Sequence, residues 1–182
     1  MRSASTEHPG SERPQRPDAP AGLARKTPLT ALDRVPWGDI QDSTGSAAAI
    51  PVLLGGIACG DADTARSALN DLRKRICQFG FVVEQATAAT VPFLWELANH
   101  PQVTVRAQII QLLKSIADAR QWESTAAVYP KLLNHRENPV AWERAARQAV
   151  RARSGELDRL MADEDTEIAE ATTELARSLG AA

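Results

Sequence analysis

Apolar residues recur at helical spacing through the middle of the chain. Within 50–57 they fall at positions i, i+3, i+4 and i+7, which lie on one face of an α-helix. A second stripe with the same period spans 65–76, and a polar turn that contains Gly60 separates the two. The pattern therefore predicts a hairpin of two amphipathic helices. The two apolar faces are Ile50, Leu53, Leu54 and Ile57, then Ala65, Ala68, Leu69, Leu72 and Ile76.

The same hairpin pattern recurs about forty residues later. The matching faces there are Val91, Leu94, Trp95 and Ala98, then Val105, Ile109, Leu112 and Ile116. A weaker third copy at 128–150 follows a predicted linker helix at 122–128, and its second helix is expected to bury Trp142, Ala145, Ala146 and Ala149. A last helix within 163–179 is expected to face the stack with Ile168, Ala171, Thr172, Leu175 and Leu179.

Two amphipathic helices cannot bury their apolar faces alone, so such hairpins are expected to stack side by side. A period near forty with two helices per unit lies in the range of HEAT and armadillo repeats. We therefore predict an all-α protein, a HEAT-like superhelix (solenoid) of about three to four helical hairpins over 31–182. Residues 1–30 hold five prolines and few large apolar side chains. They are expected to form a disordered tail.

Short motifs also resemble a known family. A proline opens each repeat (Pro51, Pro92, Pro130), and the segments "LDRVPWGDIQDSTGSAAAIPVLL" (32–54) and "CQFGFVVEQATAATVPFLWELA" (77–98) are similar to HEAT-repeat proteins of actinobacteria. The shared features are the VPW entry, the Gly-Ser before the first repeat, and the glycine-containing loop that leads to a VPFL helix. The resemblance covers about 32–118 and implies the solenoid fold. It says little about function.

The composition restricts the partners and the cellular compartment that we expect. The net charge is −2 and the pI about 5.9, which gives no global attraction to nucleic acid. The two cysteines, Cys59 and Cys77, are too far apart for a CxxC motif and are expected to be reduced thiols packed as small apolar groups. No apolar stretch approaches the roughly 20 residues of a membrane helix. A cytoplasmic protein without membrane contact is expected.

Motifs for catalysis are missing from the sequence. The three histidines have no ligand partner at helical spacing, and neither a nucleotide-binding nor a nucleophile motif is present. We therefore predict no catalytic residue, no metal site and no cofactor. Glu84 beside an apolar run, together with Trp95, is the candidate pocket for a small molecule.

Basic and amide side chains gather on the predicted second helices, which line the concave face of such solenoids. The candidate groove residues are Arg73, Arg75, Gln108, Gln111, Lys114, Arg144, Arg147 and Arg151. Trp37 is the candidate anchor at the end of the stack, because interfaces favour Trp.

These features favour a non-enzymatic scaffold or adaptor that binds another protein through its concave face. Three alternatives remain: an immunity or antitoxin-type inhibitor, a HEAT-like nucleic-acid-binding or DNA-repair protein, and a biosynthetic accessory protein or enzyme that binds a small molecule. For stability, Leu53→Ala and Leu112→Ala are each expected to cost roughly 2–5 kcal/mol.

Overall fold

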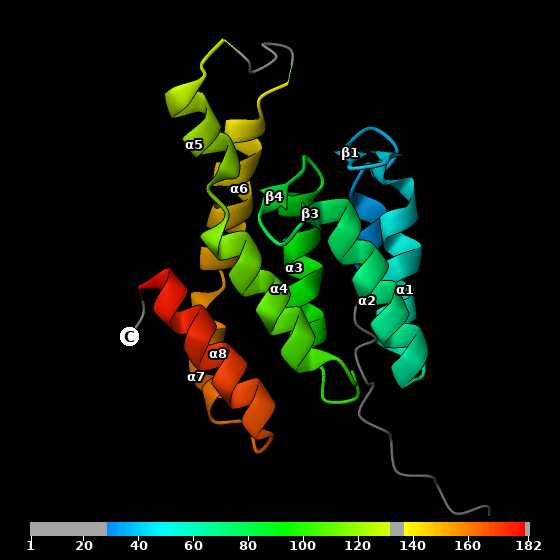
Figure 1. Cartoon of the computed structure of the whole chain (residues 1–182). Coiled ribbons are helices and arrows are strands. Elements are labelled where there is room, and N and C mark those ends of the chain that lie inside the picture. The colour runs from blue at the N-terminus through cyan, green and yellow to red at the C-terminus, as the bar shows by residue number, and fades with distance from the viewer. Residues whose placement is uncertain (1–28, 132–136, 181–182) are drawn as a thin grey trace, which may run out of the picture.

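The computed structural model describes residues 29–131 and 137–180, and this part of the chain is mostly helical (Figure 1). Residues 1–28 of the predicted tail lie outside it. The remaining two tail residues, Leu29 and Thr30, form a turn, and the Leu29 N–H donates to Glu96 Oε2 at 3.1 Å. These two residues therefore belong to the folded part of the protein and not to the tail.

The described residues form eight α-helices, three short 3₁₀ helices and four two-residue strands, which are joined by turns and loops. The α-helices are α1 (Ile50–Cys59), α2 (Ala62–Ile76), α3 (Thr87–Ala98), α4 (Arg106–Asp118), α5 (Gln121–Val128), α6 (Pro139–Arg151), α7 (Leu157–Met161) and α8 (Thr166–Leu179). The 3₁₀ helices are η1 (Leu32–Arg34), η2 (Ala47–Ala49) and η3 (Ser154–Glu156). The strands form two antiparallel ribbons, β1 (Gln41–Asp42) with β2 (Gly45–Ser46) and β3 (Cys77–Gln78) with β4 (Val82–Val83).

The first two helical hairpins, α1–α2 and α3–α4, match the apolar pattern. All the predicted core positions of the second hairpin are buried, and those of the first are buried except Leu53 and Ala68, which are half-buried. The Asp61 side chain caps α2 by accepting a hydrogen bond from the Thr64 N–H at 2.8 Å. Periodicity alone was therefore enough to identify these four helices.

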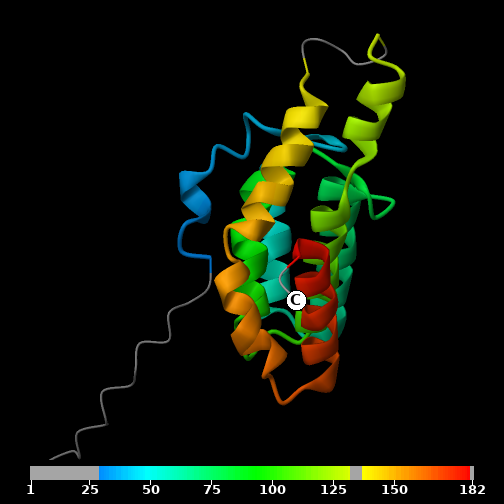
Figure 2. The same ribbon diagram turned by 90° about the vertical axis from the view of Figure 1, so that its left-hand side faces the viewer.

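The third pair of helices differs from the prediction. α6 packs against α3 and α8 packs against α4, so α6 and α8 form the layer that follows α3–α4 (Figure 2). The expected first helix at 128–136 runs into residues outside the described part, including Leu132 and Leu133. The linker helix is confirmed as α5, which lies against α6.

The buried face of α6 is also one position away from the predicted one. Its buried residues are Pro139, Glu143, Ala146 and Val150. Of the predicted residues, Trp142 and Ala149 are only half-buried and Ala145 is exposed. The prediction was wrong because it took the buried Glu143 for a surface residue.

The last helix, α8, follows its predicted pattern. Ile168, Ala171, Thr172 and Leu175 are buried, and Leu179 is half-buried. Gly180 ends the helix with φ +72°, a conformation that glycine adopts without steric cost. The outer face of α8 is polar, as the end of a helical stack requires.

Candidate functional site

The C-terminus of α2 is held by the β1–β2 turn. Ser43 Oγ donates to the Lys74 carbonyl at 2.8 Å and the Ser43 N–H to the Arg75 carbonyl at 3.0 Å. Thr87 Oγ1 donates to the Ile76 carbonyl at 2.6 Å. The carbonyl groups that a helix end leaves without partners are thus satisfied. The segment 42–44 therefore fixes where α2 stops.

Arg75, one of the predicted groove residues, is part of this arrangement. Its Nη1 lies 2.8 Å from Asp42 Oδ2 and 2.6 Å from Thr44 Oγ1, and the Asp42 side chain has no exposed surface. Burial raises the pKa of Asp42, but hydrogen bonds from Arg75 and Thr44 outweigh it and hold the pKa below its usual value. Arg75 is therefore engaged within the protein.

Two of the three arginines of α6 are also paired with a carboxylate. Arg147 Nη2 lies 2.7 Å from Glu123 Oε1, and Arg147 Nη1 donates to the Ala119 carbonyl at 2.9 Å. Arg144 reaches the same Glu123 at 3.2 Å. Hydrogen bonds from these two arginines lower the pKa of Glu123. Arg151 is exposed.

The remaining groove candidates lie on α2 and α4. Lys114 pairs with Asp118 at 3.1 Å, Gln111 is exposed, and Arg73 and Gln108 are half-buried. The structure does not bring all eight candidates onto one face. α6 packs mainly against α3 and α8 packs against α4, so α8 and not α6 continues the row of second helices, α2 and α4, that carries the other candidates (Figure 2).

Trp37 is not an exposed anchor. Only 7% of its surface is exposed, and its ring lies 5.9 Å from the ring of Phe93. Its Nε1 donates to the Leu32 carbonyl at 2.9 Å. The expectation of a surface anchor is wrong, because the segment 32–40 folds back over the helices and the indole packs in the core.

The two residues of the candidate small-molecule pocket differ in their exposure to solvent. Glu84 is half-buried, and its pKa is raised by burial and by the nearby charges of Asp42 and Glu137. Trp95 has no exposed surface, so its ring cannot line a pocket that is open to solvent.

The cysteines differ from each other. Cys77 is buried, and burial raises its pKa to about 12, so the thiol stays protonated. Cys59 is exposed at the end of α1, contrary to the expectation that both thiols are packed. Within residues 29–131 and 137–180 no group of three or more His, Cys, Asp or Glu side chains is placed to hold a metal ion. No helix in the same part of the chain is both long and apolar enough to cross a bilayer.

The feature that sequence analysis missed is the turn between β3 and β4. Phe79 and Phe81 are 84% and 47% exposed, and their rings lie 6.2 Å apart. The Phe81 N–H donates to the Gln78 carbonyl at 3.1 Å, and both central residues have positive φ, +54° at Phe79 and +81° at Gly80. These are the backbone signs of a type I′ turn, in which Asn-Gly is the favoured pair.

Hydrogen bonds to neighbouring elements hold the base of this turn in place. Trp122 Nε1 of α5 donates to the Val83 carbonyl at 2.9 Å, and the Thr87 hydroxyl accepts from the Glu84 N–H at 2.9 Å. The aromatic pair is therefore displayed on a short ribbon tied to α3 and α5. The signal in the sequence is "FGF" followed by two valines, which favours a hairpin turn and not only the helix break that Gly80 predicts.

Comparisons with protein-family models, with curated proteins and with solved structures found no match to this chain.

Proposed function

We propose that this protein is a non-enzymatic, HEAT-like solenoid that binds another protein, and that the Phe79–Phe81 turn is its principal contact. The observation that carries the proposal is the conformation of Phe79. An L-residue in the left-handed region costs about 1 kcal/mol, and Gly or Asn would relieve most of it. Phe79 combines this strain with an 84% exposed apolar ring.

Neither the strained backbone nor the exposed ring of Phe79 stabilises the protein on its own. Large exposed aromatic side chains are typical of contact sites, because they bury much apolar area at low entropic cost. Phe81 beside it enlarges the patch, and the tether from Trp122 to Val83 keeps the ribbon in place before a partner arrives. A strained, exposed and preorganised aromatic pair fits a binding role.

The exposed side of α4 is a second contact region in this proposal, because three of the predicted groove residues, Gln108, Gln111 and Lys114, belong to this helix. Gln111 is exposed there, and Lys114 and Gln108 are half-buried. Such a face suits a partner with polar groups, which would be held in place by the aromatic turn.

The test replaces the aromatic pair and compares captured partners. Tagged wild-type protein, the double variant Phe79→Asn/Phe81→Asn, and the control Val128→Asn would be expressed in the source cells, and co-purifying proteins quantified. Val128 is also exposed but lies on α5. We expect one set of proteins to be lost with the double variant and kept with the control. The same set captured by all three proteins would rule out the turn as the contact.

Stability provides an independent readout of the strain. Phe79→Asn should raise the free energy of unfolding by about 1 kcal/mol, because Asn tolerates the left-handed conformation. Phe79→Ala keeps the strain and should change it little. Urea denaturation of the three proteins measures both effects. A destabilised Phe79→Asn protein would show that the ring serves the fold instead.

A further inference from the structure

The two ends of the helical stack differ in polarity. At the α8 end the exposed side chains include Glu167, Glu170 and Glu174. At the other end α1 carries no charged residue along its length, and Val52 is 76% exposed on it. The terminal unit of a stack needs a polar outer face to stay dissolved alone. The α8 helix meets this requirement, and at the other end α2 meets it but α1 does not.

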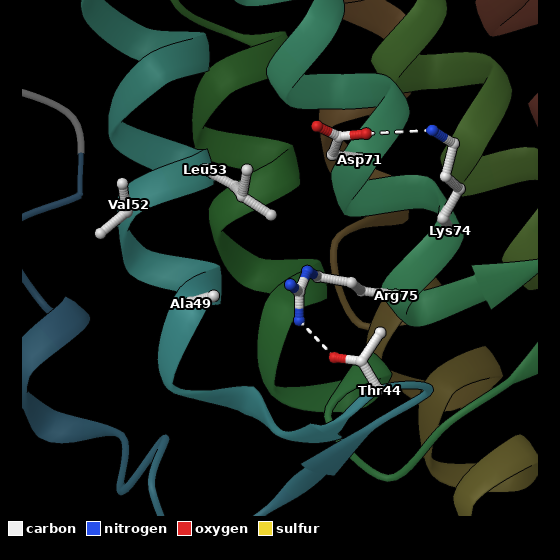
Figure 3. Close-up of a pocket in the computed structure, with 7 residues that line it drawn as sticks. All are labelled: Thr44, Ala49, Val52, Leu53, Asp71, Lys74 and Arg75. Carbon is white, nitrogen blue, oxygen red and sulfur yellow. Dashed lines mark hydrogen bonds and ion pairs between the residues drawn. The ribbon is translucent and has the colours of Figure 1, made fainter.

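An open cleft of about 500 Å³ lies between α1 and α2 at the apolar end (Figure 3). Val52 and Leu53 form its α1 side, and Asp71, Lys74 and Arg75 its α2 side. Leu53 occupies a core position of the repeat pattern but is only half-buried, because its side chain lines this open cleft. The cleft has the form of an unfilled contact between two helical layers.

We infer that a second copy of this chain covers the α1–α2 end, as a closed two-fold dimer. The rim of the cleft is self-complementary in charge. Asp71 and Lys74 lie one turn apart on α2, with Lys74 Nζ 3.0 Å from Asp71 Oδ1. A two-fold axis across α2 sets this helix antiparallel to its copy, with Asp71 opposite Lys74 of the other chain. The same pair then forms twice around an apolar centre.

The alternative, a chain of copies joined head to tail, is disfavoured by the same charges. It would place the carboxylates of α8 on Val52 and Leu53, where a buried charge needs a partner. One nearby cation, Arg75, is already held by Asp42 at 2.8 Å, and Lys74 alone cannot pair with the several carboxylates of α8. Only the two-fold arrangement buries apolar surface on both sides. Association therefore stops at the dimer.

This surface is separate from the Phe79–Phe81 turn, so the dimer and the proposed partner binding can be tested independently. Sedimentation velocity of the full chain from micromolar to submillimolar concentration should show a monomer–dimer equilibrium. Val52→Glu should weaken the dimer by about tenfold or more, since it places a carboxylate in the apolar centre. Glu170→Lys, at the other end, should leave it unchanged. Circular dichroism melts would verify that the variants fold.

Charge reversal tests the two-fold geometry itself. Lys74→Asp and Asp71→Lys should each weaken self-association, because like charges then face each other. A mixture of the two variants should recover it as a heterodimer, because opposite charges face again. A wild-type monomer at every concentration would overturn the inference and leave the cleft to residues 1–28 or to a different protein. A Val52→Glu protein that dimerises like wild type, or a mixture without recovery, would overturn it as well.

Discussion

At the scale of single residues, charged side chains that looked free in the sequence are used to hold the fold. Arg75 and Arg147 were candidates for an outward-facing groove, yet each is engaged by carboxylates of the chain itself. The sequence could not show this, because Asp42 is 33 positions from Arg75 and Glu123 is 24 from Arg147. Charge patterning identifies basic helix faces, but it does not reveal which residues are already paired across elements.

The Asp42–Arg75 pair predicts a pH-dependent stability. Because the pKa of Asp42 is lowered in the folded protein, its stabilising effect is present above the ordinary carboxyl pKa and is lost as the pH falls through the lower folded value. Asp42→Asn should cost about 1–3 kcal/mol at neutral pH. The difference from wild type should shrink below about pH 4. Urea denaturation across this range measures it, and a constant difference down to pH 2 would contradict the assignment.

At the scale of elements, the buried Glu143 explains both the position of α5 and the shifted face of α6. Its two carboxylate oxygens accept hydrogen bonds from the Trp122 and Glu123 N–H groups at 3.1 and 2.9 Å. A carboxylate at a helix N-terminus satisfies free N–H groups and interacts well with the helix dipole. Glu143 is therefore a buried cap for α5, which no periodicity in hydrophobicity could predict.

Removing this carboxylate should release α5. Glu143→Gln keeps the shape but loses the charge and one acceptor, and should cost about 2 kcal/mol. Hydrogen exchange should become faster in the amides of 121–128 and stay unchanged in α1 and α2. Glu156→Gln, on a half-buried residue of η3, is the matched control. Uniformly faster exchange in all helices would mean that Glu143 supports the whole fold and not α5 in particular.

Leu53 and Leu112 are both core positions of the repeat pattern, but they should contribute differently to the free energy of unfolding. Leu112 has no exposed surface, so Leu112→Ala should cost roughly 2–5 kcal/mol through lost burial and the cavity it leaves. Leu53 is half-buried at the open cleft, so Leu53→Ala should cost less than half as much in the monomer. Denaturation at low protein concentration compares them. Equal losses would show that Leu53 is covered in solution.

At the scale of the whole molecule, the first two layers could be predicted from sequence and the third could not. Residues 50–118 repeat one pattern at a shift of about forty, and burial follows it closely. After α4 the chain inserts α5 before α6 and α7 before α8, so the helices that pack on α3 and α4 are not consecutive along the chain. Periodicity identifies amphipathic helices, but it does not determine which pairs share a layer when the connections change length.

One ion pair joins the second and third layers at the turns. Arg106 Nη2 lies 2.7 Å from Asp163 Oδ2, and Arg106 Nε donates to the Ala98 carbonyl at 2.8 Å. Both side chains are mostly shielded from water. The hydrogen bond from Arg106 lowers the pKa of Asp163, so the carboxylate form is favoured in the folded protein. This contact links α4 to the loop before α8, which makes it a test of how the layers are coupled.

A double-mutant cycle measures that coupling. Arg106→Gln and Asp163→Asn should each destabilise the protein, and the double variant should lose about 1 kcal/mol less than the sum of the two. The exposed pair Arg66–Asp63, at the turn of the first layer, is the control and should show a coupling near zero. Arg66 binds a carboxylate of its own helix, whereas Arg106 reaches the next layer. Only the Arg106–Asp163 cycle therefore reports on the stacking of the layers. Equal coupling energies in both cycles would mean that the contact does not help to hold α8 on α4.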